Sequence, residues 1–169
     1  MANDVAANIH HMHEVARRMR GAFIEGSAWI EVLLTDIISH YFVSEKHRRL
    51  LFFSDVADAM SLYQKTTLLR KIFEHEFPEL LVEYPKLSQR LSKFREFRNL
   101  LAHNHLDTSE AAIARRKPNE VLFVVYKRGR ASTRCLTVEE VQKLADQVNK
   151  LRKELLAIQK QLFRRKKQL

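Results

Sequence analysis

Arg98 and His103, five residues apart, are the side chains of this sequence whose types and spacing best suit chemistry. An arginine holds two phosphate oxygens in a fixed fork, and a histidine takes or gives a proton near neutral pH. Cleavage of RNA needs such groups: a base removes the 2′-hydroxyl proton, that oxygen attacks the adjacent phosphorus, and a cation stabilises the added negative charge. The pair therefore fits metal-independent RNA cleavage.

A helix from Leu87 to His103 must position this pair. At about 100° per residue, one face of that helix is apolar and consists of Leu87, Leu91, Phe94, Phe97 and Leu101. Arg98 falls beside this face, and His103 lies about 140° further round, on a polar stripe with Arg95 and Asn99. The wheel predicts that Arg98 leans toward the core and His103 toward solvent, so that they do not share one face.

Glu31 is the expected partner of Arg98. It lies at the edge of the apolar face of a first helix that runs to about Phe42, whereas Asp36 points further away. A buried guanidinium needs such a carboxylate. A purely structural alternative stays open, in which Arg98 is a buried ion-pair residue and His103 merely ends its helix near the negative end of the helix dipole.

The run from Arg98 through Asn99 to His103 resembles the Arg-x4-6-His motif of the HEPN superfamily, helical bundles that include RNA-cleaving toxins and defence proteins. The resemblance covers roughly residues 20–165. It implies Arg98 as phosphate binder, His103 as acid or base and Asn99 as a positioning hydrogen bonder. It also implies a homodimer, in which two motif helices meet at a two-fold interface and two Arg/His sets surround one cleft.

The composition favours one mainly helical domain. The 169 residues fit a single domain, residues 1–169, and 3 Gly, 3 Pro, 46% apolar and 30% charged residues favour long helices over a turn-rich β fold. The formal net charge of +10 is compatible with an acidic partner such as RNA. The single Cys135 cannot form an internal disulfide, and we expect a buried thiol.

The expected architecture is an up-and-down, HEPN-like bundle of four to five helices with one small β-hairpin before the last helix. Residues 120–136 predict the hairpin, and a capping box at Thr137 and Glu140 starts the last helix. Gly21 and Gly26 permit a kink in the first helix. We expect a loop over residues 104–119 and frayed ends over residues 1–10 and 165–169.

Basic residues outside the motif are candidate RNA contacts, with solvated loops as the equally acceptable reading. They are Arg95, Arg115, Arg116, Lys117, Arg128 and Arg130. His10, His11 and His13 offer two metal ligands at helical spacing, but no third ligand is spaced with them. We therefore expect no metal and no cofactor.

The sequence predicts a metal-independent endoribonuclease of toxin or defence type that leaves a 2′,3′-cyclic phosphate and acts at a dimer cleft. The expected partners are RNA, a second copy of the chain and an antitoxin or regulatory protein. The alternative is a non-catalytic module of the same fold that binds nucleic acid or a protein. No transmembrane span or signal peptide is visible, which makes a cytoplasmic location the expectation.

Overall fold

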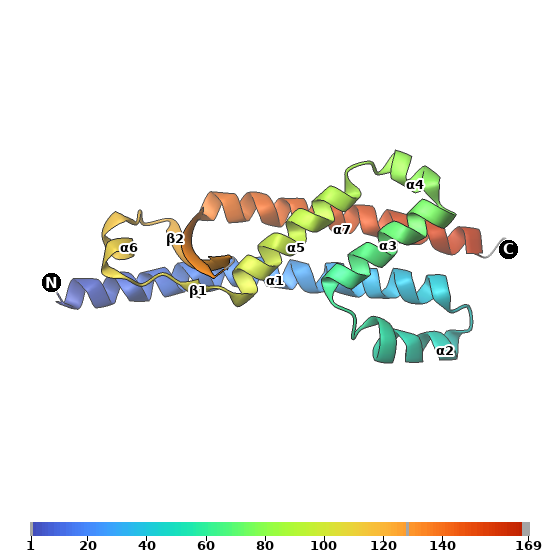
Figure 1. Ribbon diagram of the computed structural model, residues 1–169, viewed down its shortest axis with the longest axis horizontal. Helices are drawn as coiled ribbons and strands as arrows, with labels where there is room; N and C mark the ends of the chain where they lie inside the picture. The colour runs from blue at the N-terminus through green and yellow to red at the C-terminus, as the bar shows by residue number, and fades with distance from the viewer. Residues whose placement is uncertain (1, 128, 167–169) are drawn as a thin grey trace. The chain divides into compact units, whose positions relative to one another are not determined.

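The computed structural model describes residues 2–127 and 129–166 and is mainly helical, with one small antiparallel sheet (Figure 1). The predicted class, helical with a hairpin before the last helix, is confirmed. The described residues form seven α-helices and one π-helical turn: α1 (Ala2–Phe42), α2 (Lys46–Leu51), η1 (Phe52–Ala57), α3 (Leu62–Glu76), α4 (Pro78–Glu83), α5 (Leu87–His103), α6 (Glu110–Arg115) and α7 (Val138–Lys166).

The count of four to five helices was wrong because three helices of six residues each, α2, α4 and α6, lie in segments that carry too few turns for a periodicity to be recognised. Pro78 occupies the first turn of α4, where its missing N–H costs no hydrogen bond. Ser109 caps α6 by accepting a hydrogen bond from the N–H of Ala112. The segment 104–119, expected as a loop, therefore contains one short helix.

The first helix runs without a break from Ala2 to Phe42, past Gly21 and Gly26. The expected fraying of residues 1–10 stays a prediction. Each glycine costs roughly 1 kcal/mol relative to alanine inside a helix. A long apolar face offsets this cost, because its residues are buried at spacings of three, four and seven: Met12, Ala16, Met19, Phe23, Ile30, Leu34 and Ile37. At the other end of the chain, α7 continues to Lys166, and residues 167–169 lie outside the described residues.

Two capping boxes fix helix starts, and the sequence predicted the one at Thr137. Ser61 and Gln64 exchange hydrogen bonds at the start of α3, where Ser61 Oγ accepts from the Gln64 N–H at 3.2 Å. Thr137 and Glu140 do the same at the start of α7, with distances of 2.9 and 3.1 Å. Such a cap stabilises a helix by about 1 kcal/mol. The boundary between the hairpin and α7 is thereby fixed at Thr137.

The sheet has three strands in the order β1-β2-β3: β1 (His105–Leu106), β2 (Glu120–Lys127) and β3 (Arg130–Thr137). Both neighbouring pairs are antiparallel. Gly129 turns the hairpin with φ +75°, a backbone conformation that residues with a Cβ rarely adopt. Side chains alternate between faces, so Val121, Phe123 and Leu136 lie on one buried face.

The contacts group the chain into two compact units, and the single domain expected from the chain length stays a prediction. The first unit holds the residues up to Gly26 and Phe97–Gln147, which include the sheet and the end of α5. The second holds Ser27–Glu96 and the residues from Val148 onward. Each unit has buried apolar side chains of its own, such as Phe123 in the first and Phe73 in the second.

Within the second unit, polar side chains join α7 to its neighbours. Gln159 donates to Asp36 of α1, and Gln161 donates to Glu83 of α4 at 3.0 Å. An ion pair joins Arg90 of α5 to Glu154. Among the helices of the described residues, none combines the length and the apolar character needed to cross a bilayer.

Candidate functional site

Arg98 and His103 meet at the C-terminal end of α5. Arg98 Nη1 lies 3.1 Å from His103 Nε2 and 3.5 Å from Asn99 Oδ1. Because a guanidinium has donors and no acceptor, Nε2 of the imidazole must accept this hydrogen bond through its lone pair. In this contact the lone pair of Nε2 therefore faces the Arg98 guanidinium.

The helical wheel predicted the exposure of Arg98 and His103 correctly, but it did not predict their contact. Arg98 is half-buried, while Asn99 and His103 are exposed. The wheel separated Arg98 from His103 by about 140° and predicted no shared face. The arginine side chain is long enough to span that separation, and a wheel of backbone positions takes no account of side-chain length. The structure therefore brings together the three residues proposed for catalysis.

The residue after His103 fixes the end of the helix. Asn104 donates from its backbone N–H to the Leu100 carbonyl at 3.3 Å, and its side-chain Nδ2 donates to the carbonyls of Asn99 and Leu100 at 3.3 and 3.1 Å. These bonds satisfy carbonyls that a helix end otherwise leaves without partners. His103 is thus held on an ordered last turn.

Arg20 of α1 adds a further hydrogen bond at Asn104, and the sequence analysis did not identify this residue. Its Nη2 donates to the Asn104 carbonyl at 2.7 Å, and its guanidinium lies 5.4 Å from the centroid of the Phe123 ring. The chain then enters β1, where His105 pairs with Val124. The sequence signal was an arginine between the buried Met19 and Phe23, a position where a charged group needs a partner.

Two predicted residues of the site belong to the second unit. Glu31 is half-buried in α1, and its backbone carbonyl accepts from Thr35 Oγ1 at 2.8 Å. Its pairing with Arg98 stays a prediction. Arg95 is half-buried, and its guanidinium lies 4.8 Å from the centroid of the Tyr63 ring. This stacking holds the Arg95 side chain through a cation–π contact.

The other candidate RNA contacts lie in the first unit. Arg115 and Lys117 are exposed near the end of α6, while Arg116 is half-buried and donates to the Glu120 carbonyl at 3.3 Å. Lys117 Nζ lies 3.9 Å from Glu120 Oε1. Arg130 is exposed at the first position of β3. Arg128, the remaining candidate, lies outside the described residues.

Asp107 organises the segment between β1 and α6. Its Oδ1 accepts from the Ser109 hydroxyl at 2.7 Å and from the Ser109 N–H at 3.2 Å, and its Oδ2 accepts from Thr133 Oγ1 at 2.9 Å. The Ser109 hydroxyl bond, with the Thr133 and backbone bonds and the Arg115 charge, lowers the pKa of Asp107, although partial burial opposes this. The ionised carboxylate therefore ties α6 to the hairpin.

The difference in unfolding free energy between the wild-type protein and Asp107→Asn should shrink as the pH falls. Because the folded-state pKa of Asp107 is depressed, its ionised form stabilises the fold above the unfolded value of about 3.9, and this contribution is lost as the pH falls through the folded-state pKa. Urea denaturation at pH 7 and at acid pH measures the difference. Ser132→Ala, which removes a hydroxyl bonded to the Val125 carbonyl at 3.2 Å, is the control with a pH-independent effect. A constant difference for Asp107→Asn contradicts the prediction.

The expectation of a buried Cys135 was wrong, because the residue is exposed on β3. Its strand position alternates with the buried Leu136, so its side chain lies on the other face of the sheet. Partial burial of the thiol nevertheless raises its pKa, and the charge and hydrogen bond of Glu120 add to the rise. A thiol with a raised pKa is a poor nucleophile at neutral pH.

The histidines near the N-terminus do not form a metal site with other residues of the described chain. His10, His11 and His13 are all exposed on α1, and His11 Nε2 lies 3.3 Å from the Pro118 carbonyl. Within residues 2–127 and 129–166, the His, Cys, Asp and Glu side chains do not gather in groups of three or more that could hold a metal ion.

Comparison of the chain with known protein families, with curated proteins and with solved structures gives no match. The assignment to the HEPN superfamily therefore stays a prediction. It rests on the spacing of Arg98 and His103 near the end of a helix.

Proposed function

We propose that the protein is a metal-independent endoribonuclease of toxin or defence type, which uses Arg98 and His103 to cleave RNA. The observation that carries this proposal is the 3.1 Å contact between Arg98 Nη1 and His103 Nε2 at an exposed helix end. A phosphate-binding cation and a proton-transfer group thereby lie within reach of the same phosphodiester. The net charge of +10 favours association with a polyanion.

The contact also supplies a mechanism for substrate-dependent activation. In the free protein, Arg98 occupies the basic lone pair of His103. A phosphodiester offers the guanidinium two oxygens and a stronger, charge-assisted hydrogen bond. When Arg98 turns to the phosphate, Nε2 of His103 is released to remove the 2′-hydroxyl proton. Asn99, whose amide oxygen lies 3.5 Å from the guanidinium, helps to hold Arg98 in either position.

The reaction proceeds by attack of the 2′-oxygen on phosphorus and departure of the 5′-oxygen, which takes up a proton. The products are a 2′,3′-cyclic phosphate and a 5′-hydroxyl end. One histidine serves one of the two proton transfers at a time, so a homodimer that brings a second Arg98 and His103 to the cleft completes the site. An antitoxin or regulatory protein that covers the exposed His103 would silence it.

The purified protein should cleave single-stranded RNA in excess EDTA and leave 2′,3′-cyclic phosphate ends, because neither proposed group needs a metal. Gel analysis of labelled RNA with mass spectrometry of the products measures this. Specific activity should rise with protein concentration in the range where sedimentation shows dimer formation. Absence of cleavage across RNAs of varied sequence contradicts the proposal.

A second candidate function, a non-catalytic interaction module, is favoured by a separate observation in the second unit. Trp29 and Val32 of α1, three residues apart, are 55% and 46% exposed. Exposed aromatic and branched side chains on one helix face are typical of surfaces that bind proteins. The RNA cleavage assay separates the two candidate functions, because a non-catalytic module does not cleave RNA.

A further inference from the structure

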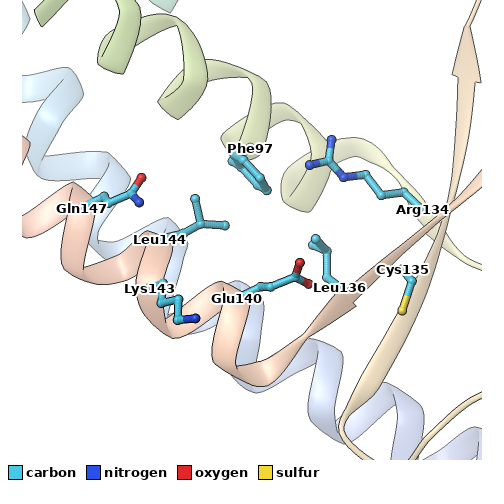
Figure 2. Close-up of a pocket in the computed structure, with 8 residues that line it drawn as sticks. All are labelled: Phe97, Arg134, Cys135, Leu136, Glu140, Lys143, Leu144 and Gln147. Carbon is cyan, nitrogen blue, oxygen red and sulfur yellow. The ribbon is translucent and has the colours of Figure 1, made fainter. Parts of the chain in front are cut away.

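A surface pocket of about 250 Å³ lies in the first unit, between the end of α5, strand β3 and the start of α7 (Figure 2). Phe97 of α5, Leu136 of β3 and Leu144 of α7 give it apolar walls. The volume is below the roughly 300–1,000 Å³ of sites that enclose drug-sized ligands. It suits one flat ring system better than a whole nucleotide.

One wall of the pocket carries a stacked pair. The Arg134 guanidinium lies 4.8 Å from the centroid of the Phe97 ring, and Figure 2 shows the two side chains next to each other at the pocket's edge. Bases of single-stranded RNA are recognised by stacking on aromatic rings and on guanidinium planes. An exposed arginine on a half-buried phenylalanine supplies both kinds of surface.

A fixed carboxylate supplies polarity at the opposite wall. Glu140 Oε2 accepts from the Thr137 N–H at 2.9 Å, and the Glu140 N–H donates to Thr137 Oγ1 at 3.1 Å. The capping box therefore holds the side chain in place. Its other oxygen, Oε1, accepts no hydrogen bond within the part of the chain that the structure describes.

An ionised carboxylate accepts hydrogen bonds and cannot donate them. Guanine presents two adjacent donors, N1–H and the 2-amino group, whereas adenine presents the acceptor N1 beside its 6-amino group. Glu140 therefore favours guanine and repels adenine. The Gln147 amide, also on the pocket wall, can donate to the O6 acceptor of guanine.

We propose that this pocket binds a guanine base of single-stranded RNA, with the ring against Phe97 and Arg134 and its donor edge on Glu140. The inference rests on the proposed function, which supplies the RNA. Phe97 directly precedes Arg98, about 1.5 Å along the helix axis and about 100° around it. A base in the pocket and a phosphate on Arg98 can therefore belong to the same strand, and the pocket gives the enzyme a preference for guanine near the cleaved bond.

Isothermal titration calorimetry with 5′-GMP, 5′-IMP, 5′-AMP and inorganic phosphate tests the pocket without any cleavage step. 5′-GMP should bind about tenfold more tightly than 5′-AMP, because guanine brings two donors to Glu140 where adenine brings the N1 lone pair against it. 5′-IMP, which lacks the 2-amino group, should fall between them. Equal affinities for 5′-GMP, 5′-AMP and phosphate overturn the proposal.

Glu140→Gln is the matched variant, since glutamine also serves in a capping box and keeps the helix start. Its amide replaces an acceptor with a donor, so the preference for 5′-GMP should fall to within about twofold. Gln142→Ala, exposed on α7 away from the pocket, should leave the preference unchanged. A preference that survives Glu140→Gln overturns the assignment of Glu140.

The two proposals fail separately. If the protein binds 5′-GMP selectively but cleaves no RNA, the guanine pocket is supported and the ribonuclease proposal is contradicted. If the protein cleaves RNA but shows no guanine preference in binding or in cut-site mapping, the ribonuclease proposal is supported and the guanine pocket is contradicted.

Discussion

His103→Ala lowers the rate of RNA cleavage by about 10²- to 10⁴-fold, the usual contribution of one proton-transfer group, and leaves the fold intact. The fold survives because the His103 side chain is exposed and contacts the Arg98 side chain at the surface of the same helix. The measurement is kcat/KM for a labelled RNA in EDTA, with far-UV circular dichroism and urea denaturation of the same preparation.

His105→Ala is the matched control. His105 is also exposed and lies two residues further along, but its contribution to the structure is the backbone pairing of β1 with Val124. Its substitution should change the cleavage rate less than about twofold, because substitutions of exposed side chains away from a site have small effects. Equal losses for His103→Ala and His105→Ala contradict the proposed role of His103.

Arg98→Lys separates charge from geometry at the same site. Lysine keeps the positive charge but not the planar fork that holds two phosphate oxygens, so the rate should fall short of wild type and exceed that of Arg98→Ala. If Arg98→Ala instead lowers the free energy of unfolding while His103→Ala has no measurable effect on cleavage, that result supports a structural role of Arg98 and His103 and contradicts the catalytic one.

Phe123→Ala destabilises the protein by about 3–5 kcal/mol, the typical cost of emptying a buried phenylalanine site. Phe123 on β2 has 0% exposure, and the Arg20 guanidinium lies over its ring. The same guanidinium donates to the Asn104 carbonyl, which follows the last residue of α5. Urea denaturation followed by circular dichroism gives the difference. Phe123→Leu keeps much of the apolar volume and should cost less, so the prediction stays measurable if the alanine variant does not fold.

Tyr126→Ala on the same strand is the control, because Tyr126 is 71% exposed and its side chain lies on the other face. Its cost should stay within about 0.5 kcal/mol. A similar loss for both variants would show that the two faces of β2 are assigned wrongly.

Local patterns determined much of the fold. The capping box at Thr137 lies where the sequence placed it, because a cap depends on residues within four positions of each other. The hairpin also followed from local signals, the apolar, valine-rich run before the turn and Gly129 at the turn itself. The long helices followed from apolar residues that recur every three to four positions.

Packing overturned local expectations where a side chain's neighbours come from distant segments. Lysines are mostly exposed, but Lys65 on α3 has 2% exposure, with its Nζ 3.5 Å from the Asp58 carbonyl. A lysine stem can cover apolar surface while its head reaches a partner, which no periodicity reveals. β1 likewise has two residues and no pattern of its own, and it exists because β2 supplies its hydrogen bonds.

For the site, the sequence by itself determined the residue types and the helix that bears them: Arg98, Asn99 and His103 on α5, with His103 directed to solvent. The length of the arginine side chain decided that the guanidinium reaches Nε2, and only the tertiary structure decided that Arg20 bonds the Asn104 carbonyl and that Glu140 lines a pocket beside Phe97. The physical reason is range. Helix and cap formation depend on neighbours within about four residues, whereas side-chain direction and burial depend on segments far apart in the chain.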